Sequence, residues 1–333
     1  MAAKIIAAVL AFQLGLAPCA ANIATYSNST DTAAVQTDTA QSVIGHRYAD
    51  KAEGIAYFEK NDVYYNNLSQ RDLNWRMKKI GANTEELREY AKKQVMDFTD
   101  EEKQYIDNSL ARISQRFDEI GFKYPLDKDI VFVKTTMSEE MDAGGYTFEN
   151  YIFLGESLID DYLNAGEDYF NTRDEILAHE ICHVLSRNDR DFRAKLYKSI
   201  GFELGDEPEF SDEVKTKILS NPDVEKYDCY SYFTVDGKKK KGTVVSVFDE
   251  DYKEGEYAFN YMVPYVVFYD EPDKIYPISE ISDFYDVFGK NTEYIIAAEE
   301  CLADNFSFAV VYGDKANYSS PEIIKYILKV MSE

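Results

Sequence analysis

The feature that most constrains this chain is the pentapeptide His179-Glu180-Ile181-Cys182-His183, which contains two of its three histidines. Residues four apart lie on the same face of a helix, so both imidazoles can reach one ion if this segment is helical. Two histidines at this spacing, with a glutamate directly after the first, are typical of zinc sites. The pentapeptide therefore predicts a helix that carries part of a metal centre, and the fold must bring a further ligand to it.

The third ligand is not a histidine near the pentapeptide. A catalytic zinc site needs three protein ligands and one open position. The only other histidine is His46, far upstream, and the position six residues after His183, where some zinc enzymes have a third histidine, is Asp189. A carboxylate is therefore the economical third ligand.

A suitable carboxylate lies in the apolar segment near the C-terminus. Glu300 and Asp304 lie four apart in this segment, where charged residues are costly unless they are paired or bind a metal. We expect Glu300 to bind zinc and Asp304 to accept a hydrogen bond from the outer nitrogen of His179, which fixes the orientation of that ring. Glu299 is the adjacent competitor, but it lacks an acidic partner four residues further on.

Glu180 is expected to act on the substrate and not to bind the metal. Zinc lowers the pKa of a bound water toward about 7. Glu180 would take the proton as the water attacks a carbonyl carbon, and would then pass it to the leaving amine. The pattern thus predicts a zinc-dependent hydrolase with Glu180 as general base.

The motif His179-Glu180-x-x-His183 followed by Glu300-x-x-x-Asp304 resembles the gluzincin metallopeptidases, of which thermolysin is the type. The resemblance implies hydrolysis of peptide bonds in peptide or protein substrates. It also implies an α+β, zincin-like fold with a small mixed sheet, an active-site helix and a second ligand helix. Gluzincins usually have a His, Tyr or Arg that stabilises the oxyanion, and Tyr227, Tyr230 and Tyr294 are the candidates for that role.

Two further segments extend the resemblance. Asn150–Leu154 is similar to the gluzincin edge strand, along which a substrate adds as an antiparallel strand. Asn221-Pro222-Asp223, together with both ligand segments, is similar to a group of bacterial exported zincins over roughly residues 130–306. From the residues alone, Asn-Pro favours a plain turn, with a cleft-shaping loop as the alternative.

Two other functions fit the same motifs. A surface or binding protein could keep a zincin fold with little peptidase activity, because a long insertion separates the two ligand segments and no motif assigns the oxyanion residue. A zinc hydrolase could instead cleave a non-peptide amide, such as a cell-wall linkage. An open edge strand would favour a peptide substrate, whereas an occluded one would favour binding or autoinhibition.

The N-terminal residues indicate export. Residues 1–24 have the charge, the short apolar stretch and the small residues of a secretory signal peptide. Residues 25–45 are rich in Thr, Ser and Ala and predict a flexible linker. We therefore expect a secreted or cell-surface bacterial protein. A lipoprotein anchor at Cys19 is the less favoured alternative, because Pro18 precedes that cysteine.

The rest of the chain divides by its periodicity. Residues 46–122 are expected to be mainly helical and to pack on the catalytic part as a cap or upper lobe. Within them, Thr99 begins a capping box for a helix that ends at Gly121. Residues 123–333 form the expected catalytic domain, with an insertion at about 203–290. Helices are expected from Thr172 to Asn188 and from Pro321 to Met331, and Lys238–Lys241 is expected to form a solvated turn.

The charge and the cysteine content exclude some classes of protein. The net charge of −25 argues against nucleic acid as a partner, and no later segment is apolar and long enough to span a membrane. Once the signal is removed, three cysteines remain, and an odd number cannot form a fully paired disulfide framework. Cys182 and Cys301 are expected to be buried packing residues, with a disulfide between them as the alternative.

Overall fold

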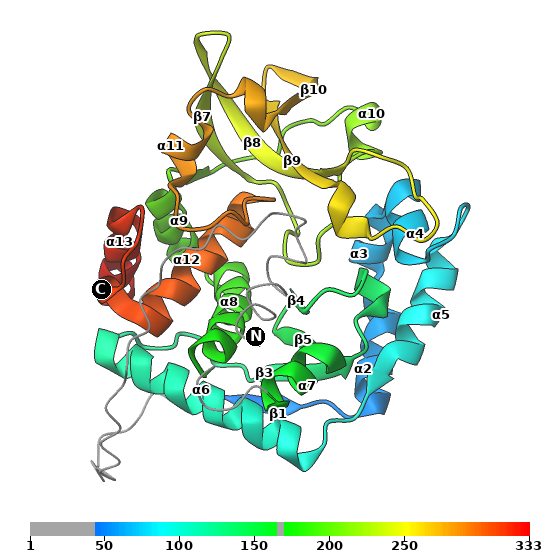
Figure 1. The fold of residues 1–333 in the computed structure, drawn as a ribbon, viewed down its shortest axis with the longest axis vertical. Coiled ribbons are helices and arrows are strands. Elements are labelled where there is room, and N and C mark those ends of the chain that lie inside the picture. The colour runs from blue at the N-terminus through cyan, green and yellow to red at the C-terminus, as the bar shows by residue number, and fades with distance from the viewer. Residues whose placement is uncertain (1–43, 165–169) are drawn as a thin grey trace.

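The computed structural model describes residues 44–164 and 170–333, in which helices pack around one sheet and a second sheet lies at one end of the molecule (Figure 1). The predicted α+β class is confirmed at this level, including the mixed sheet. The predicted signal peptide and all but the last two residues of the predicted linker lie outside the described residues. Within them, no helix is both long enough and apolar enough to cross a membrane.

The first sheet is mixed and has its strands in the order β1-β3-β5-β4, with β2 also paired to β3. Strand β3 runs parallel to β1 and β5, whereas β4 and β2 pair antiparallel. The strands are β1 His46–Tyr48, β2 Val95–Met96, β3 Ile130–Thr135, β4 Gly145–Phe148 and β5 Tyr151–Gly155.

Helices cover both faces of this sheet. Ile130 and Phe132 pack in the same core as helices α6 and α8, whereas Val131 and Val133 face the core formed with α2 to α5. This explains the uninterrupted apolar run in β3, because a strand buried on both faces has no polar side. The helices are α2 Lys51–Lys60, α3 Asp62–Asn67, α4 Gln70–Arg76, α5 Thr84–Gln94, α6 Asp100–Ile120, α7 Glu156–Asn164 and α8 Phe170–Asn188.

The residues before Lys123 therefore do not form the expected cap. They supply strand β1, the helices on one face of the sheet and helix α6 on the other. Because both faces of β3 need apolar cover, α6 shares one core with α8, whereas α2 to α5 form a second core on the other face of the sheet.

The edge strand of the first sheet is β4, so the expectation that residues 150–154 form the edge is wrong. Tyr151–Gly155 is β5, which lies between β3 and β4. A two-residue turn at Glu149 and Asn150 folds β4 back on β5, and Glu149 has a positive φ of 50°, as such tight hairpins require.

Two of the three predicted helices have both of their predicted ends, and the third ends at Asn188 as predicted. Thr99 forms the predicted capping box with Glu102, and Gly121 ends α6 in the left-handed region. Helix α13 spans Pro321–Met331, as predicted. Helix α8 instead begins at Phe170, two residues before Thr172, so the capping box expected there is wrong.

The second sheet is antiparallel, has the order β10-β9-β8-β7-β6 and lies within the predicted insertion. Lys238–Lys241 begins strand β8 and does not form the expected turn. Asp236 and Gly237 make that turn, both with positive φ. The strands are β6 Glu203–Leu204, β7 Cys229–Val235, β8 Lys238–Phe248, β9 Met262–Phe268 and β10 Glu271–Pro277.

The remaining helices lie between and after these strands. Helix α12 packs against α8, and α13 packs against α12 (Figure 1). These helices are α9 Arg190–Tyr197, α10 Asp212–Lys215, α11 Phe284–Phe288, α12 Ala298–Tyr312 and α13 Pro321–Met331. Short 3-10 turns are η1 Ser138–Glu140, η3 Lys198–Ile200, η4 Ala258–Tyr261, η5 Ile278–Glu280 and η6 Gly313–Lys315.

A buried ion-pair network joins the N-terminal helices to the insertion. The guanidinium of Arg76 donates to Asp72 at 3.0 Å, to Glu140 at 3.0 Å and to the Ser220 carbonyl at 2.6 Å. Arg76 is 1 % exposed. The same Asp72 accepts the Ser220 backbone N–H at 3.0 Å. Ser220 is thus held by both of its backbone polar groups.

Replacing Arg76 with Met is expected to destabilise the protein by about 3–5 kcal/mol, because two buried carboxylates lose their cation. Urea unfolding followed by circular dichroism measures the loss. Arg116→Met is the matched control. That arginine is partly exposed and pairs with Glu119 on the same helix, so its loss should cost no more than about 0.5 kcal/mol. Equal losses in the two variants would contradict the role assigned to Arg76.

Candidate metal centre

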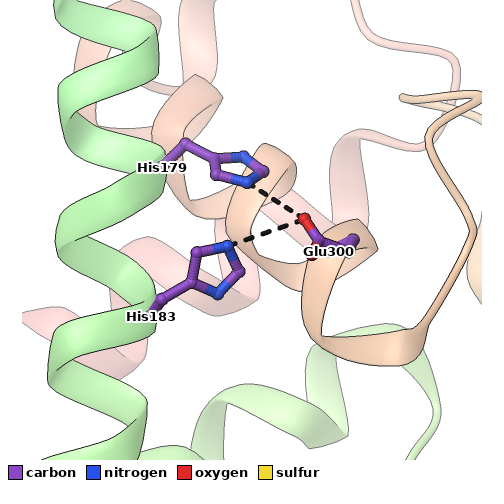
Figure 2. A group of neighbouring side chains, drawn as sticks. All are labelled: His179, His183 and Glu300. Atoms are coloured by element: carbon purple, nitrogen blue, oxygen red, sulfur yellow. Dashed lines mark hydrogen bonds and ion pairs between the residues drawn. The ribbon is translucent and has the colours of Figure 1, made fainter. Parts of the chain in front are cut away.

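Helices α8 and α12 bring the three predicted ligands together. Figure 2 shows the imidazoles of His179 and His183 on α8 pointing toward the carboxylate of Glu300 on α12. Oε2 of Glu300 lies 3.2 Å from Nε2 of His179 and 3.6 Å from Nε2 of His183. One potential ligand atom from each residue lies within 4.8 Å of the other two. This is a compact N,N,O group of the kind that zinc takes in catalytic sites.

Each imidazole has a second carboxylate behind it. Nδ1 of His179 lies 2.9 Å from Oδ1 of Asp304, in the place predicted for Asp304. Nδ1 of His183 lies 3.5 Å from Oε1 of Glu299. Both rings therefore have Nδ1 beside a carboxylate and Nε2 facing Glu300, an arrangement that sets the tautomer and orientation of a metal-binding histidine.

Glu299 is the adjacent competitor for the third ligand, but its carboxylate is engaged elsewhere. It accepts hydrogen bonds from Ser186 and Tyr197, and it lies 3.6 Å from Nε of Arg193. It stands on the Nδ1 side of His183, away from the face that the three candidate ligands share. Its place as the orienting partner of His183 could not be seen in the sequence, because no spacing links it to that residue.

Asn221 holds the other oxygen of Glu300. Its side-chain amide donates to Oε1 of Glu300, which leaves Oε2 directed at the two imidazoles. Asn221 belongs to the Asn-Pro-Asp segment for which a plain turn was the favoured expectation. The structure supports the alternative of a cleft loop, since Asp223 also lines the cleft.

The buried charges of this group call for a cation. Burial lowers the pKa of His179, but hydrogen bonds to Asp304 and Glu300 outweigh that effect and raise the pKa to about 10. Burial raises the pKa of Glu299, but its interaction with His183 outweighs that effect and lowers the pKa to about 2. The acidic groups thus favour positive charge on the imidazoles, and a divalent cation bound to neutral imidazoles would satisfy the same demand.

Unpartnered buried atoms are a second sign that the group fits a metal. Both ring nitrogens of His183 are buried without a hydrogen-bond partner, and so is Oε2 of Glu180. The carboxylates near His183 lie at ion-pair distance but do not meet hydrogen-bond geometry. Such atoms are rare in folded proteins, because each one loses the hydration it would have in water. A metal bound to Nε2 of His183 would give that nitrogen the partner it lacks.

Glu180 faces the edge strand across the cleft. A Cβ added to Gly145 of β4 would lie 2.9 Å from Oε1 of Glu180, so only glycine fits there without movement. Burial, together with the nearby Asp223, raises the pKa of Glu180 above its ordinary value. The cleft encloses ≈ 790 Å³, part of it open to solvent, and is lined by residues that include Gly145, Glu175, Ile176, His179, Glu180, Asp223, Phe259, Tyr294, Glu300 and Asp304.

A second group of possible ligands overlaps the first. Atoms of Glu180, His183 and Asp223 also lie within 4.8 Å of one another. Oδ1 of Asp223, however, accepts two hydrogen bonds from Thr147, at 2.7 Å each. In the first group, no described residue outside the group forms a hydrogen bond of this kind with Nε2 of His179, Nε2 of His183 or Oε2 of Glu300.

Of the three candidate tyrosines, the structure brings one to the cleft. Tyr227 donates to the Leu219 carbonyl, and Tyr230 donates to Glu203 at the surface. Tyr294 lines the cleft, with its ring centroid 6.1 Å from that of His179. Its hydroxyl forms no hydrogen bond within the described ranges, so it is available to a bound substrate.

Two other predicted features lie outside the metal group. Cys182 and Cys301 are free and buried, so their predicted packing role is confirmed and the alternative disulfide is wrong. The third histidine, His46, lies in β1, where its ring is largely buried and contacts Asp107 at 2.9 Å.

The chain was compared with protein-family models, with curated proteins and with solved structures, and none of the three comparisons gave a match.

Proposed function

We propose that the protein is an exported zinc-dependent metallopeptidase with a zincin-like catalytic core. The observation that carries the proposal is the convergence of Nε2 of His179, Nε2 of His183 and Oε2 of Glu300, with an orienting carboxylate behind each imidazole. These residues would hold the zinc ion. When bound, zinc acts as a Lewis acid and makes water a stronger nucleophile at neutral pH.

The chain's own residues would divide the remaining work. Glu180 is a buried carboxylate on the cleft wall with one unpartnered oxygen, and it is placed to accept a proton from water and return it to the leaving amine. Asn221 and Asp304 hold Glu300 and His179 in orientation. Gly145 on the edge strand β4 has no side chain, which lets the carboxylate of Glu180 lie directly against the strand along which a substrate backbone would pair. Together these features favour a hydrolase over a binding protein with the same metal group.

Tyr294 is expected to donate a hydrogen bond to the oxygen that becomes negatively charged during the reaction. Tyr294→Phe should lower kcat by roughly 10- to 100-fold while KM and zinc content change little, because the interaction forms mainly in the transition state. Tyr227→Phe is the matched control, since that hydroxyl bonds the Leu219 carbonyl instead. Steady-state kinetics on one peptide measures both variants. A Tyr294→Phe enzyme as active as the Tyr227→Phe enzyme would remove Tyr294 from the mechanism.

The proposed activity is tested by incubating the zinc-loaded protein with a mixture of peptides and identifying products by mass spectrometry. Hydrolysis that stops with a chelator and returns with zinc is the expected result. A zinc-loaded protein that cleaves no peptide would contradict the proposal and favour the binding protein. Cleavage of a cell-wall amide instead would favour the other alternative.

A further inference from the structure

The edge strand β4 offers two outward backbone positions to a ligand. Backbone pairing in antiparallel strands alternates between the two sides of each strand. Gly144 accepts the N–H of Gly155, and the hairpin turn pairs Phe148 with Tyr151, so these residues and Tyr146 bond toward β5. Gly145 and Thr147 therefore direct their backbone polar groups outward. A peptide that adds to the sheet would have to pair there.

One of these two positions is already taken by the insertion. Oδ1 of Asp223 accepts both the backbone N–H and the hydroxyl of Thr147, at 2.7 Å each. The other outward position, Gly145, lies next to Glu180, and among the described residues its backbone has no hydrogen-bond partner outside the sheet. The edge is thus open beside the proposed base and closed two residues further along β4.

Asp223 is held firmly in this place. Asn221 accepts the backbone N–H of Asp223 at 2.9 Å and donates to Glu300. Arg187 donates to the Thr147 hydroxyl at 3.0 Å and contacts the Pro222 carbonyl. The preceding Ser220 is fixed by the buried network around Arg76. A substrate would therefore meet Asp223 as a wall of the cleft.

The closed side corresponds to one end of a peptide. In an antiparallel arrangement, a peptide residue opposite Gly145 is followed, toward the peptide's N-terminus, by residues opposite Tyr146 and Thr147. The carboxylate of Asp223 stands in the way of the last of these. A peptide with its scissile bond beside Glu180 therefore has room for only one or two residues on the N-terminal side of that bond.

The charge of the closed end suits a free amine. Oδ2 of Asp223 accepts no hydrogen bond from the residues that the structure describes, and Asp223 lines the cleft. The described lining residues include Glu175, Glu180, Glu300 and Asp304 but no Lys or Arg. A carboxylate with one oxygen unpaired in such surroundings attracts an ammonium group, which donates up to three hydrogen bonds.

We propose that the site is an aminopeptidase site, in which Asp223 binds the α-ammonium of a peptide and limits cleavage to its N-terminal end. This inference rests on the proposed peptidase function. In the reaction, the oxygen of water bonds to the carbonyl carbon as the C–N bond breaks. A proton of water passes through Glu180 to the leaving amine, which becomes the new N-terminus, and the one or two residues on the N-terminal side of the bond are released.

The first test compares two peptides of identical sequence, one with a free N-terminus and one N-acetylated, with the zinc-loaded protein. Mass spectrometry should show sequential loss of N-terminal residues from the free peptide and at least a roughly 100-fold lower kcat/KM for the acetylated one. Equal rates, or cleavage at internal bonds, would overturn this inference alone. No hydrolysis of any peptide would overturn the proposed function itself.

The second test is Asp223→Asn, which keeps an oxygen for the Thr147 N–H but removes the charge. It should lower kcat/KM for the free peptide by roughly 10- to 100-fold, mainly through KM, and should leave zinc content unchanged. Glu225→Gln is the matched control, because Glu225 pairs with Arg187 and is half exposed. Loss of zinc in Asp223→Asn would make Asp223 a metal ligand and overturn the inference. If the variant fails to fold, the comparison of the two peptides decides.

Discussion

Glu180→Gln is expected to lower kcat by roughly 10²- to 10⁴-fold while zinc binding is retained. Glutamine has nearly the same shape but cannot accept a proton at neutral pH. The Glu180 carboxylate is buried against Gly145, and its Oε2 has no hydrogen-bond partner. Replacing that oxygen with an amide group therefore breaks no hydrogen bond of Oε2. Peptide hydrolysis measured beside zinc content separates a lost base from a lost metal.

The matched control for Glu180→Gln is Glu225→Gln, which makes the same chemical change outside the cleft and should leave kcat and zinc content near those of the wild type. A Glu180→Gln protein that retains a tenth or more of the wild-type kcat would contradict the assignment of Glu180. Loss of zinc from that protein would instead show that Glu180 is a ligand, as the second group of possible ligands allows.

Glu300→Ala is expected to weaken zinc binding by roughly 100-fold or more, with activity lost in proportion at limiting zinc. The substitution removes the carboxylate oxygen that lies close to both imidazoles and leaves the amide of Asn221 without its partner. Competition with a chelator of known affinity measures the zinc affinity of each variant.

Glu299→Gln is the comparison that identifies the third ligand. An orienting carboxylate contributes less than a ligand, so this variant should lose only about 10- to 100-fold in zinc affinity. Unchanged zinc affinity in Glu300→Ala would contradict the account. A larger loss in Glu299→Gln than in Glu300→Ala would move the third ligand to Glu299.

The candidate ligands could be predicted because their chemistry is strongly restricted. Two histidines at helical spacing in a histidine-poor chain indicate a metal. Two acidic residues on an apolar helix are costly to bury unless they are paired or bind a metal. Both helices lie where this reasoning placed them, with Glu300 between the imidazoles. By contrast, Glu299, Asn221 and Asp223 reach the site only through tertiary packing, which no local spacing encodes.

The errors in the predicted fold have a common physical origin. Residues 150–154 were wrongly expected at the edge because the hairpin before them could not be seen. Its turn depends on a positive φ at Glu149, a residue type that does not indicate such a turn. The helices before Lys123 looked like a separate cap because periodicity shows which face of a helix is apolar but not what that face packs against. The apolar run of β3 was the available clue that both of its faces need cover.

Elemental analysis of the purified wild-type protein after zinc loading and removal of free metal tests the central claim most directly. The account predicts close to one zinc ion per chain, bound by His179, His183 and Glu300. A wild-type protein that is folded and yet holds no zinc would contradict it.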